Sequence, residues 1–168
     1  MSPDFLLVEK MKAGNGRAGE QFVRKHYPSI YQYCFLHIHN RDLAEDMTQE
    51  TFLRFFETID TYTELGKTKN YLYSIAGNCM KNYYKKKKEL LPGEMPDIPE
   101  ENAGSMELRM DVERAVDRLP EDLKEVTILF FFQGLKQREI AELLNINLPL
   151  VKYRIREAKK KLSEYLGR

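Results

Sequence analysis

Residues 135–166 read LKQREIAELLNINLPLVKYRIREAKKKLSEYL, and this stretch decides the fold of the C-terminal part of the chain. Apolar residues first recur at helical spacing, and the small Ala141 lets a second helix approach closely. Asn145 then interrupts the pattern, and asparagine tolerates the left-handed backbone of a tight turn. A second apolar stripe follows through Val151, Ile155 and Ala158. The pattern predicts a helix-turn-helix.

The opposite side of the second predicted helix is basic. Lysine and arginine neutralise phosphates or donate to guanine edges, and tyrosine suits a phosphate or a thymine methyl group. A solvated cationic face on an ordinary helical hairpin is the alternative interpretation. The turn pattern and the cations together favour the DNA major groove, read by Lys152, Tyr153, Arg156 and Lys159 or Lys160.

Three further amphipathic stripes, starting at Phe22, Ala44 and Tyr71, fill the N-terminal half. Their three-to-four spacing predicts three helices. The second helix follows a break at Asn40, and Asp42 is placed to cap its start. The N-terminal half is therefore predicted to be helical.

The stretch from 61 to 70 contains Gly66 and many polar residues and is predicted to be a loop before the third of these helices. The third helix runs into the lysines Lys85 to Lys88, which on their own resemble a solvated tail. Aromatic and amide side chains beside cations suit unpaired bases. We expect such groups off the buried face at Tyr73, Asn78, Lys81, Asn82 and Tyr84.

The net charge of +1 averages strongly segregated segments. Residues 81–88 hold five lysines and no acid, residues 89–101 hold five acids and no base, and residues 150–168 carry seven cations against two acids. Prolines, glycines and acids around 89–106 suit an extended tether. We predict an all-α fold: two small helical domains, 1–88 and 107–168, joined by a flexible acidic linker at 89–106.

A helix through Val112 and Leu119 and another opened by Pro120 are expected at the start of the second domain. The run ILFFF, Ile128 to Phe132, allows a strand when read alone, but its flanks keep helical spacing. We therefore expect a helix there.

The composition also excludes several classes of protein. No apolar stretch is long enough for a membrane span, and the N-terminus lacks a signal peptide, so we expect a cytoplasmic protein that is not inserted in a membrane. Cys34 and Cys79 are isolated on apolar stripes and are expected to be reduced and buried. His37 and His39 lie two residues apart on a helix and point in different directions, which argues against a metal-dependent enzyme. We expect no cofactor, metal ion, catalytic residue or small-molecule substrate.

Three segments resemble one known family. AEDMTQETFLRFF (44–56), NYLYSIAGNCMKNYYKKKK (70–88) and the helix-turn-helix occur in the order found in extracytoplasmic-function (ECF) sigma factors of the sigma-70 family, the promoter-recognition subunits of bacterial RNA polymerase. The resemblance covers nearly the whole chain. It implies binding to core RNA polymerase, through the beta-prime clamp and the beta flap, and to promoter DNA. A cognate anti-sigma factor is implied by the resemblance alone.

The resemblance also assigns roles to residues. The first segment matches the helix that docks on the polymerase clamp, which implies polymerase binding by Asp46, Gln49, Glu50, Phe52 and Arg54. The next helix and the loop before it, Thr63 to Lys69, match the part that opens the minus-10 element and holds a flipped base. This implies minus-10 contacts by Thr63, Lys67, Lys69, Asn78, Lys81, Asn82 and Lys85. The helix-turn-helix implies minus-35 contacts by Lys152, Tyr153, Arg154, Arg156 and Lys159.

The sequence departs from the family pattern at three positions. Tyr71 replaces the usual tryptophan, while Pro149 and Leu150 replace a glycine and a threonine.

An ordinary helix-turn-helix regulator that acts without polymerase is the alternative function. It accounts only for the C-terminal half, and it predicts a dimer bound tightly to a palindrome.

Overall fold

A computed structural model describes residues 2–90 and 107–167, with side chains from residue 111 in the second range. The chain divides into two compact units, 1–99 and 100–168. The described residues of both are helical, without a strand. The predicted all-α class is therefore confirmed, and the chain forms two units as predicted. From residue 91 onward the predicted linker lies outside the described residues.

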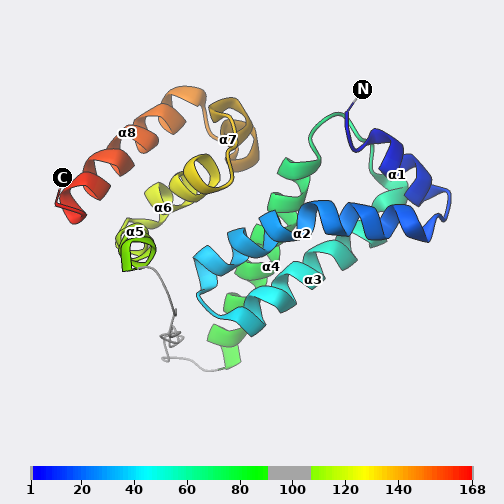
Figure 1. Cartoon of the computed structure of the whole chain (residues 1–168), viewed down its shortest axis with the longest axis horizontal. Helices are drawn as coiled ribbons and strands as arrows, with labels where there is room; N and C mark the ends of the chain where they lie inside the picture. Colours follow the sequence, from blue (N-terminus) through cyan, green and yellow to red (C-terminus); the bar gives the residue numbers. More distant parts are fainter. Residues whose placement is uncertain (1, 91–106, 168) are drawn as a thin grey trace. The chain divides into compact units, whose positions relative to one another are not determined.

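The N-terminal domain is a bundle of packed helices. Helices α2 (Gly16–Ile38), α3 (Arg41–Glu57) and α4 (Thr68–Leu90) contact one another, as Figure 1 shows, and α1 (Phe5–Lys12) packs on α2. A short 3₁₀ turn, η1 (Ile59–Thr61), follows α3. At the centre Phe22 stacks on Phe55 with ring centroids 4.7 Å apart. Both rings are fully buried, so the predicted stripes do face a common core.

The start of α3 corrects the predicted cap. Asn40 is the N-cap, because its Oδ1 accepts a hydrogen bond from the Leu43 N–H at 3.0 Å. Asp42 is the second residue of α3, in its first turn, where a carboxylate interacts favourably with the positive end of the helix dipole. Its side chain is therefore a charge in the first turn and does not cap the helix.

The N-terminal end of the chain contributes an ion-pair cluster that periodicity did not predict. Asp4 is 6% exposed, and its Oδ1 lies 2.8 Å from Lys25 Nζ and 3.1 Å from His26 Nε2. Burial alone would raise the pKa of Asp4, but the hydrogen bonds from His26 and Lys25 outweigh it and hold the pKa at about 2. The cluster ties the start of α1 to α2.

The C-terminal domain contains α5 (Glu107–Asp117), α6 (Glu121–Thr127), α7 (Gln137–Leu144) and α8 (Leu148–Tyr165). Leu119, Leu123 and Ala158 form a buried cluster, with Leu162 and Tyr165 packed on it. Pro120 is the residue just before α6 and not its first residue.

The run ILFFF is helical, as expected, but it is a π-helix, η2 (Ile128–Phe132). The N–H of Gln133 donates to the carbonyl of Ile128, five residues earlier, at 3.0 Å. Four consecutive residues, 126–129, are buried, which explains why this stretch resembles a strand when read alone. Phe131 points outward and is 46% exposed.

Both cysteines are free and buried, as predicted. Burial raises the pKa of Cys34 to about 12 and also raises the pKa of Cys79. Among the described helices none is long and apolar enough to cross a membrane.

Candidate nucleic-acid interface

The corner of the helix-turn-helix forms where the sequence predicts it. Asn145 has φ 54° and ψ 47°, the left-handed conformation, and it ends α7. The Ile146 N–H donates to the Ala141 carbonyl at 3.1 Å, and Ile146 is half-buried. Asn147 caps α8 by accepting from the Leu150 N–H at 2.9 Å. Pro149, one of the departures from the family pattern, occupies the first turn, where its missing N–H costs nothing.

Helix α8 has a buried side and a basic side, as predicted. Val151, Ile155 and Ala158 are buried. The exposed side chains on the other side are Lys152, Tyr153, Arg156, Lys159 and Lys160. We call these five residues the α8 basic face.

Aromatic rings accompany two of the cations on this face. The Arg156 guanidinium lies 5.7 Å from the ring centroid of Tyr153, and Lys159 Nζ lies 5.6 Å from that of Phe131. Such contacts restrict the cations to a smaller set of conformations. Phe131 comes from η2, and nothing in the amphipathic pattern of the sequence singled it out.

Arg154 differs from the other predicted minus-35 residues. Its side chain is 22% exposed, and Nε lies 3.7 Å from Oδ2 of Asp122. The structure therefore directs Arg154 toward α6 of its own domain and not onto the α8 basic face.

A second basic face lies on α4 of the N-terminal domain. Four predicted minus-10 residues are exposed there at positions one helical turn apart, which places them on one side of the helix: Asn78, Lys81, Asn82 and Lys85.

Tyr73 was predicted on this side, and that prediction is wrong. Its ring is 1% exposed and packs edge-on against Tyr33 with centroids 5.0 Å apart. Tyr84 is half-buried.

The loop before α4 is shorter than predicted. It ends at Lys67, because α4 begins at Thr68, and Lys69 therefore lies in the first turn of the helix. Thr63, Lys67 and Lys69 are all exposed. The predicted residues thus surround the start of α4, two from the loop and one from the helix.

One buried carboxylate organises this loop, and it was not predicted from the sequence. Glu64 is 6% exposed and accepts hydrogen bonds from the hydroxyls of Tyr62 and Thr68 and from two backbone N–H groups, at Gly66 and Lys67. Burial raises the pKa of Tyr62 to about 12, and the Glu64 carboxylate adds to the shift. A glutamate four residues before a threonine is common in sequences, so the pattern alone carried no signal.

Helix α3 places most of its predicted residues at the surface. Asp46 and Gln49 are exposed, and Glu50 Oε1 pairs with Arg54 Nε at 2.9 Å. Phe52 is different: it is 4% exposed and its ring lies 6.2 Å from that of Phe22. Phe52 belongs to the core, and the polar members remain available to a partner.

Two family models match this chain in sequence. Sigma-70 region 2 matches residues 22–89, and Sigma-70 region 4 matches residues 109–162. Together they span most of the chain. The chain belongs to the sigma-70 family, as an ECF sigma factor. Such proteins direct RNA polymerase to promoters for the initiation of transcription and are not enzymes.

Named relatives support this assignment. The sigma factor is 29% identical to the ECF RNA polymerase sigma factor SigW of Bacillus subtilis, over 95% of this chain and 94% of SigW. It is 28% identical to the ECF RNA polymerase sigma factor SigE of Mycolicibacterium smegmatis, over 89% of this chain and 62% of SigE. It therefore spans nearly all of SigW but less than two thirds of SigE.

Solved structures share the fold. CnrH, in complex with the cytosolic domain of CnrY, superimposes with a TM-score of 0.77 at 24% identity, covering 98% of this sigma factor and 97% of CnrH. The sigma factor RpoE of Bartonella quintana, in complex with the anti-sigma factor NepR, gives a TM-score of 0.72 at 22% identity, covering 88% and 96%.

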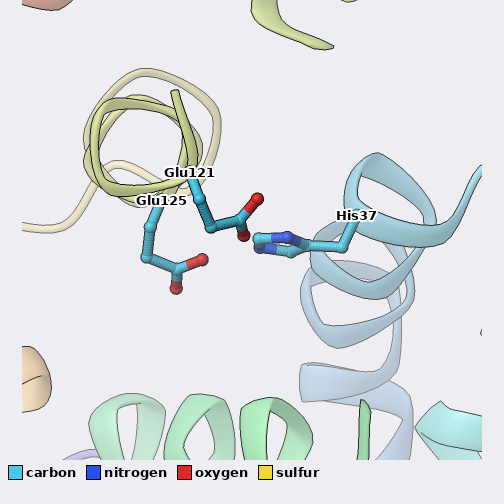
Figure 2. Close-up of side chains that lie close together, drawn as sticks. All are labelled: His37, Glu121 and Glu125. Atoms are coloured by element: carbon cyan, nitrogen blue, oxygen red, sulfur yellow. The ribbon is translucent and has the colours of Figure 1, made fainter. Parts of the chain in front are cut away.

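Histidines and acids are the side chains of this sigma factor that bind metal ions in other proteins. Glu121 and Glu125 project from α6 one turn apart, as Figure 2 shows, while His37, drawn with them, belongs to α2 of the other domain. His37 packs edge-on against Tyr33, and His39 ends α2 in the left-handed conformation. Two carboxylates one turn apart are usual on an exposed helix, so within each domain the described residues give no set of three ligands.

Proposed function

We propose that the N-terminal domain, residues 1–88, binds core polymerase and opens the minus-10 element, and that the C-terminal domain, residues 107–168, reads the minus-35 element. The observation that carries this proposal is the presence of two exposed basic faces on two separate helical units. Joining two weak contacts on one DNA raises the effective concentration of the second. Residues 89–106 would act as the tether.

The minus-10 assignment rests on α4 and the loop before it. Asn78, Lys81, Asn82 and Lys85 share one exposed side of α4, and lysine and amide groups suit unpaired bases and the phosphates between them. Flipping a base out of the duplex costs a few kcal/mol, so its pocket must be rigid. The four hydrogen bonds received by Glu64 supply that rigidity. Thr63, Lys67 and Lys69 then project from a fixed frame.

The minus-35 assignment rests on the α8 basic face. Its lysines and Arg156 suit phosphates and guanine edges in the major groove, and the ring of Tyr153 suits a thymine methyl group. Arg154 contributes less to this reading because it faces Asp122. We assign it to holding α8 against α6.

Helix α3 is proposed to bind the beta-prime clamp of core polymerase through Asp46, Gln49, Glu50 and Arg54. Phe52 supports this surface from the core. The C-terminal domain is proposed to meet the beta flap.

We further propose that the protein works in the cytoplasm and is held inactive by a cognate anti-sigma factor. The complex of RpoE with the anti-sigma factor NepR supports the second part of this proposal.

The deciding experiment mixes the purified protein with sigma-free core RNA polymerase, follows co-elution by size exclusion, and then measures run-off transcription from a library of promoter fragments. We expect a complex and new transcripts from promoters that share two elements. Lys152→Ala should weaken promoter selection and leave the complex intact, whereas Glu50→Ala should weaken the complex without changing which promoters the remaining complex transcribes. If both variants weakened the complex and promoter selection alike, the division of roles would be wrong. Absence of a complex, with tight binding of the free protein to a palindrome, would favour the regulator that acts without polymerase.

A further inference from the structure

Phe131 is a large aromatic side chain that the C-terminal domain holds at its surface. Its ring is 46% exposed, although the first two residues of the same π turn, Ile128 and Leu129, are fully buried. Phe130 packs edge-on against this ring, with centroids 4.9 Å apart. The Gln133 N–H donates to the Ile128 carbonyl, five residues earlier, and π turns of this kind are frequent at functional sites. Packing of the domain core does not account for the place of this ring.

The ring of Phe131 restrains one cation of the α8 basic face. Lys159 Nζ lies 5.6 Å from the ring centroid, which is within the range of a cation–π contact. A lysine side chain loses conformational entropy when a partner fixes it, and a contact that already restricts the side chain lowers this cost. The ring does not neutralise the charge of Lys159. Arg154, on the same helix, is held instead by the Asp122 carboxylate, which offsets its charge.

Lys159 and Lys160 differ in the charges that lie one helical turn away. Both side chains are exposed. Lys160 has Glu157 three residues before it and Glu164 four residues after it, which is the spacing of ion pairs on a helix. The corresponding positions around Lys159 hold no acid. The sequence left open which of the two lysines meets DNA, and both the ring contact and the neighbouring charges favour Lys159.

The position of Lys159 along α8 suits a phosphate better than a base. In helix-turn-helix proteins, residues near the start of the second helix contact base edges. Lys159 follows Lys152 by seven residues, which places it about 10 Å further along the helix axis. A cation at that distance from the base-reading end is placed to neutralise a phosphate at the edge of the major groove.

We propose that Phe131 is a positioning residue for promoter recognition, which holds Lys159 in place to neutralise a phosphate beside the minus-35 element. The inference rests on the proposed role of the α8 basic face. Phe131 acts through Lys159 and does not read base edges itself. Because phosphate contacts carry no sequence information directly, loss of the ring should weaken promoter binding without changing which promoters are preferred.

The test is a double-mutant cycle in the complex of the full-length protein with core RNA polymerase, with affinity for one promoter fragment measured by filter binding. Phe131→Leu removes the ring and keeps a large apolar side chain, and Lys159→Met removes the charge and keeps an unbranched side chain. We expect Phe131→Leu to weaken promoter binding about threefold. Lys159→Met should weaken it about fivefold and reduce the salt slope by about 1. The double variant should bind no more weakly than Lys159→Met.

Two matched variants control the cycle. Phe131→Tyr keeps an aromatic ring and should restore wild-type affinity. Phe131→Leu should cost the same threefold when Lys160→Met is present, because the cation that contacts the ring is Lys159. The thermal midpoint of each variant is measured alongside. A loss of stability caused by Phe131→Leu would be common to all backgrounds, so the coupling to Lys159 still decides.

An equal loss from Phe131→Leu with and without the Lys159 charge would overturn the inference, because the ring would then act on DNA or on the fold directly. A lower affinity for core polymerase in Phe131→Leu would also overturn it, since the ring would belong to a protein interface.

The failure of the inference is distinguishable from the failure of the proposed function. If Lys152→Ala and Arg156→Ala weaken promoter binding while the changes at Phe131 and Lys159 are not coupled, the inference alone is wrong. If Lys152→Ala and Arg156→Ala leave promoter binding unchanged, the role of the α8 basic face itself is wrong.

Discussion

The ring of Tyr71 stacks on the ring of Tyr62, with centroids 4.7 Å apart and planes 16° from parallel. The Tyr71 hydroxyl lies 2.9 Å from that of Thr58, and its ring meets Phe55 edge-on at 5.8 Å. Tyr71, one of the departures from the family pattern, is therefore packed on three sides. It joins the first turns of α4 to the end of α3 and to the loop assigned to the minus-10 element.

Tyr71→Ala should destabilise the N-terminal domain by about 2 kcal/mol, because it removes a half-buried ring and its stacking. Tyr71→Phe should cost only about 0.5 kcal/mol, since it keeps the ring and loses one exposed hydrogen bond. Urea unfolding, with hydrogen exchange of residues 59–90 to isolate this domain, measures both. Equal losses in the two variants would mean that the hydroxyl, and not the ring, holds this corner.

Glu64→Gln should loosen the loop before α4. The carboxylate accepts from four donors, and an amide would turn an NH₂ group toward at least one of them. We expect a loss of about 1 to 3 kcal/mol, with faster hydrogen exchange at residues 62–68. Glu57→Gln, an exposed position at the end of α3, is the control. Unchanged exchange in Glu64→Gln would show that the loop does not depend on this charge.

Asp4 should make the N-terminal domain less stable in acid. Its pKa is about 2 in the folded chain, below the ordinary value of 3.8, because the hydrogen bonds from His26 and Lys25 overcome burial. A lowered pKa means that the stabilisation is present above about pH 4 and is lost as the pH falls toward 2. The shift corresponds to about 2 kcal/mol.

The measurement compares the unfolding free energy of the wild type with that of Asp4→Asn across pH 2 to 7. The difference should be largest at neutral pH and should shrink between pH 4 and pH 2. Asp60→Asn, an exposed acid in the same domain, controls for general charge effects. A difference that stayed constant over this range would exclude the Asp4 ion pairs as its source.

Arg154 and Arg156 form a matched pair on α8. Arg156→Ala should weaken promoter binding by the polymerase complex about tenfold, because this side chain lies on the α8 basic face. Arg154→Ala should change promoter binding little and stability by less than about 1 kcal/mol, since its partner Asp122 is an exposed acid. Quantitative footprinting of the complex on one promoter measures both. The reverse order would place the DNA on the α6 side of the helix.

Promoter binding by the complex should depend steeply on salt. If the basic faces make about six phosphate contacts or more, affinity should fall roughly a thousandfold or more between 50 and 200 mM salt. Filter binding across this range, with Lys152→Ala as a variant of reduced slope, measures it. A flat response would contradict the assignment of both basic faces to DNA.

The sequence predicted features that depend on local chemistry. Asn145 adopts the left-handed turn because asparagine tolerates that backbone conformation. Val151, Ile155 and Ala158 are buried because their spacing places three apolar side chains on one face of the helix. Positions with two equivalent candidates were less predictable. Asn40 and Asp42 can both cap a helix, and the extended backbone at Asn40 decides between them.

Burial of aromatic residues was also ambiguous. Tyr71 and Tyr73 both fit an apolar stripe of α4, and Tyr73 was predicted to lie off the buried face. Packing against Tyr33 of α2 buries it instead, and neighbours so distant in sequence leave no local pattern. The same reason hides Asp4, whose carboxylate contacts His26 of the next helix.

The π-helix has a consequence for how this chain tolerates changes in length. Each residue of an α-helix turns the following side chains by about 100°, and a π turn accommodates one residue more than the α-helical repeat. Deleting one residue from Ile128–Phe132 would restore α-helical spacing. It would also rotate the buried side of α6, which carries Leu123 and Val126, by about that angle relative to the turn that begins at Gln133. The single extra residue in this turn therefore sets the direction in which the chain leaves α6.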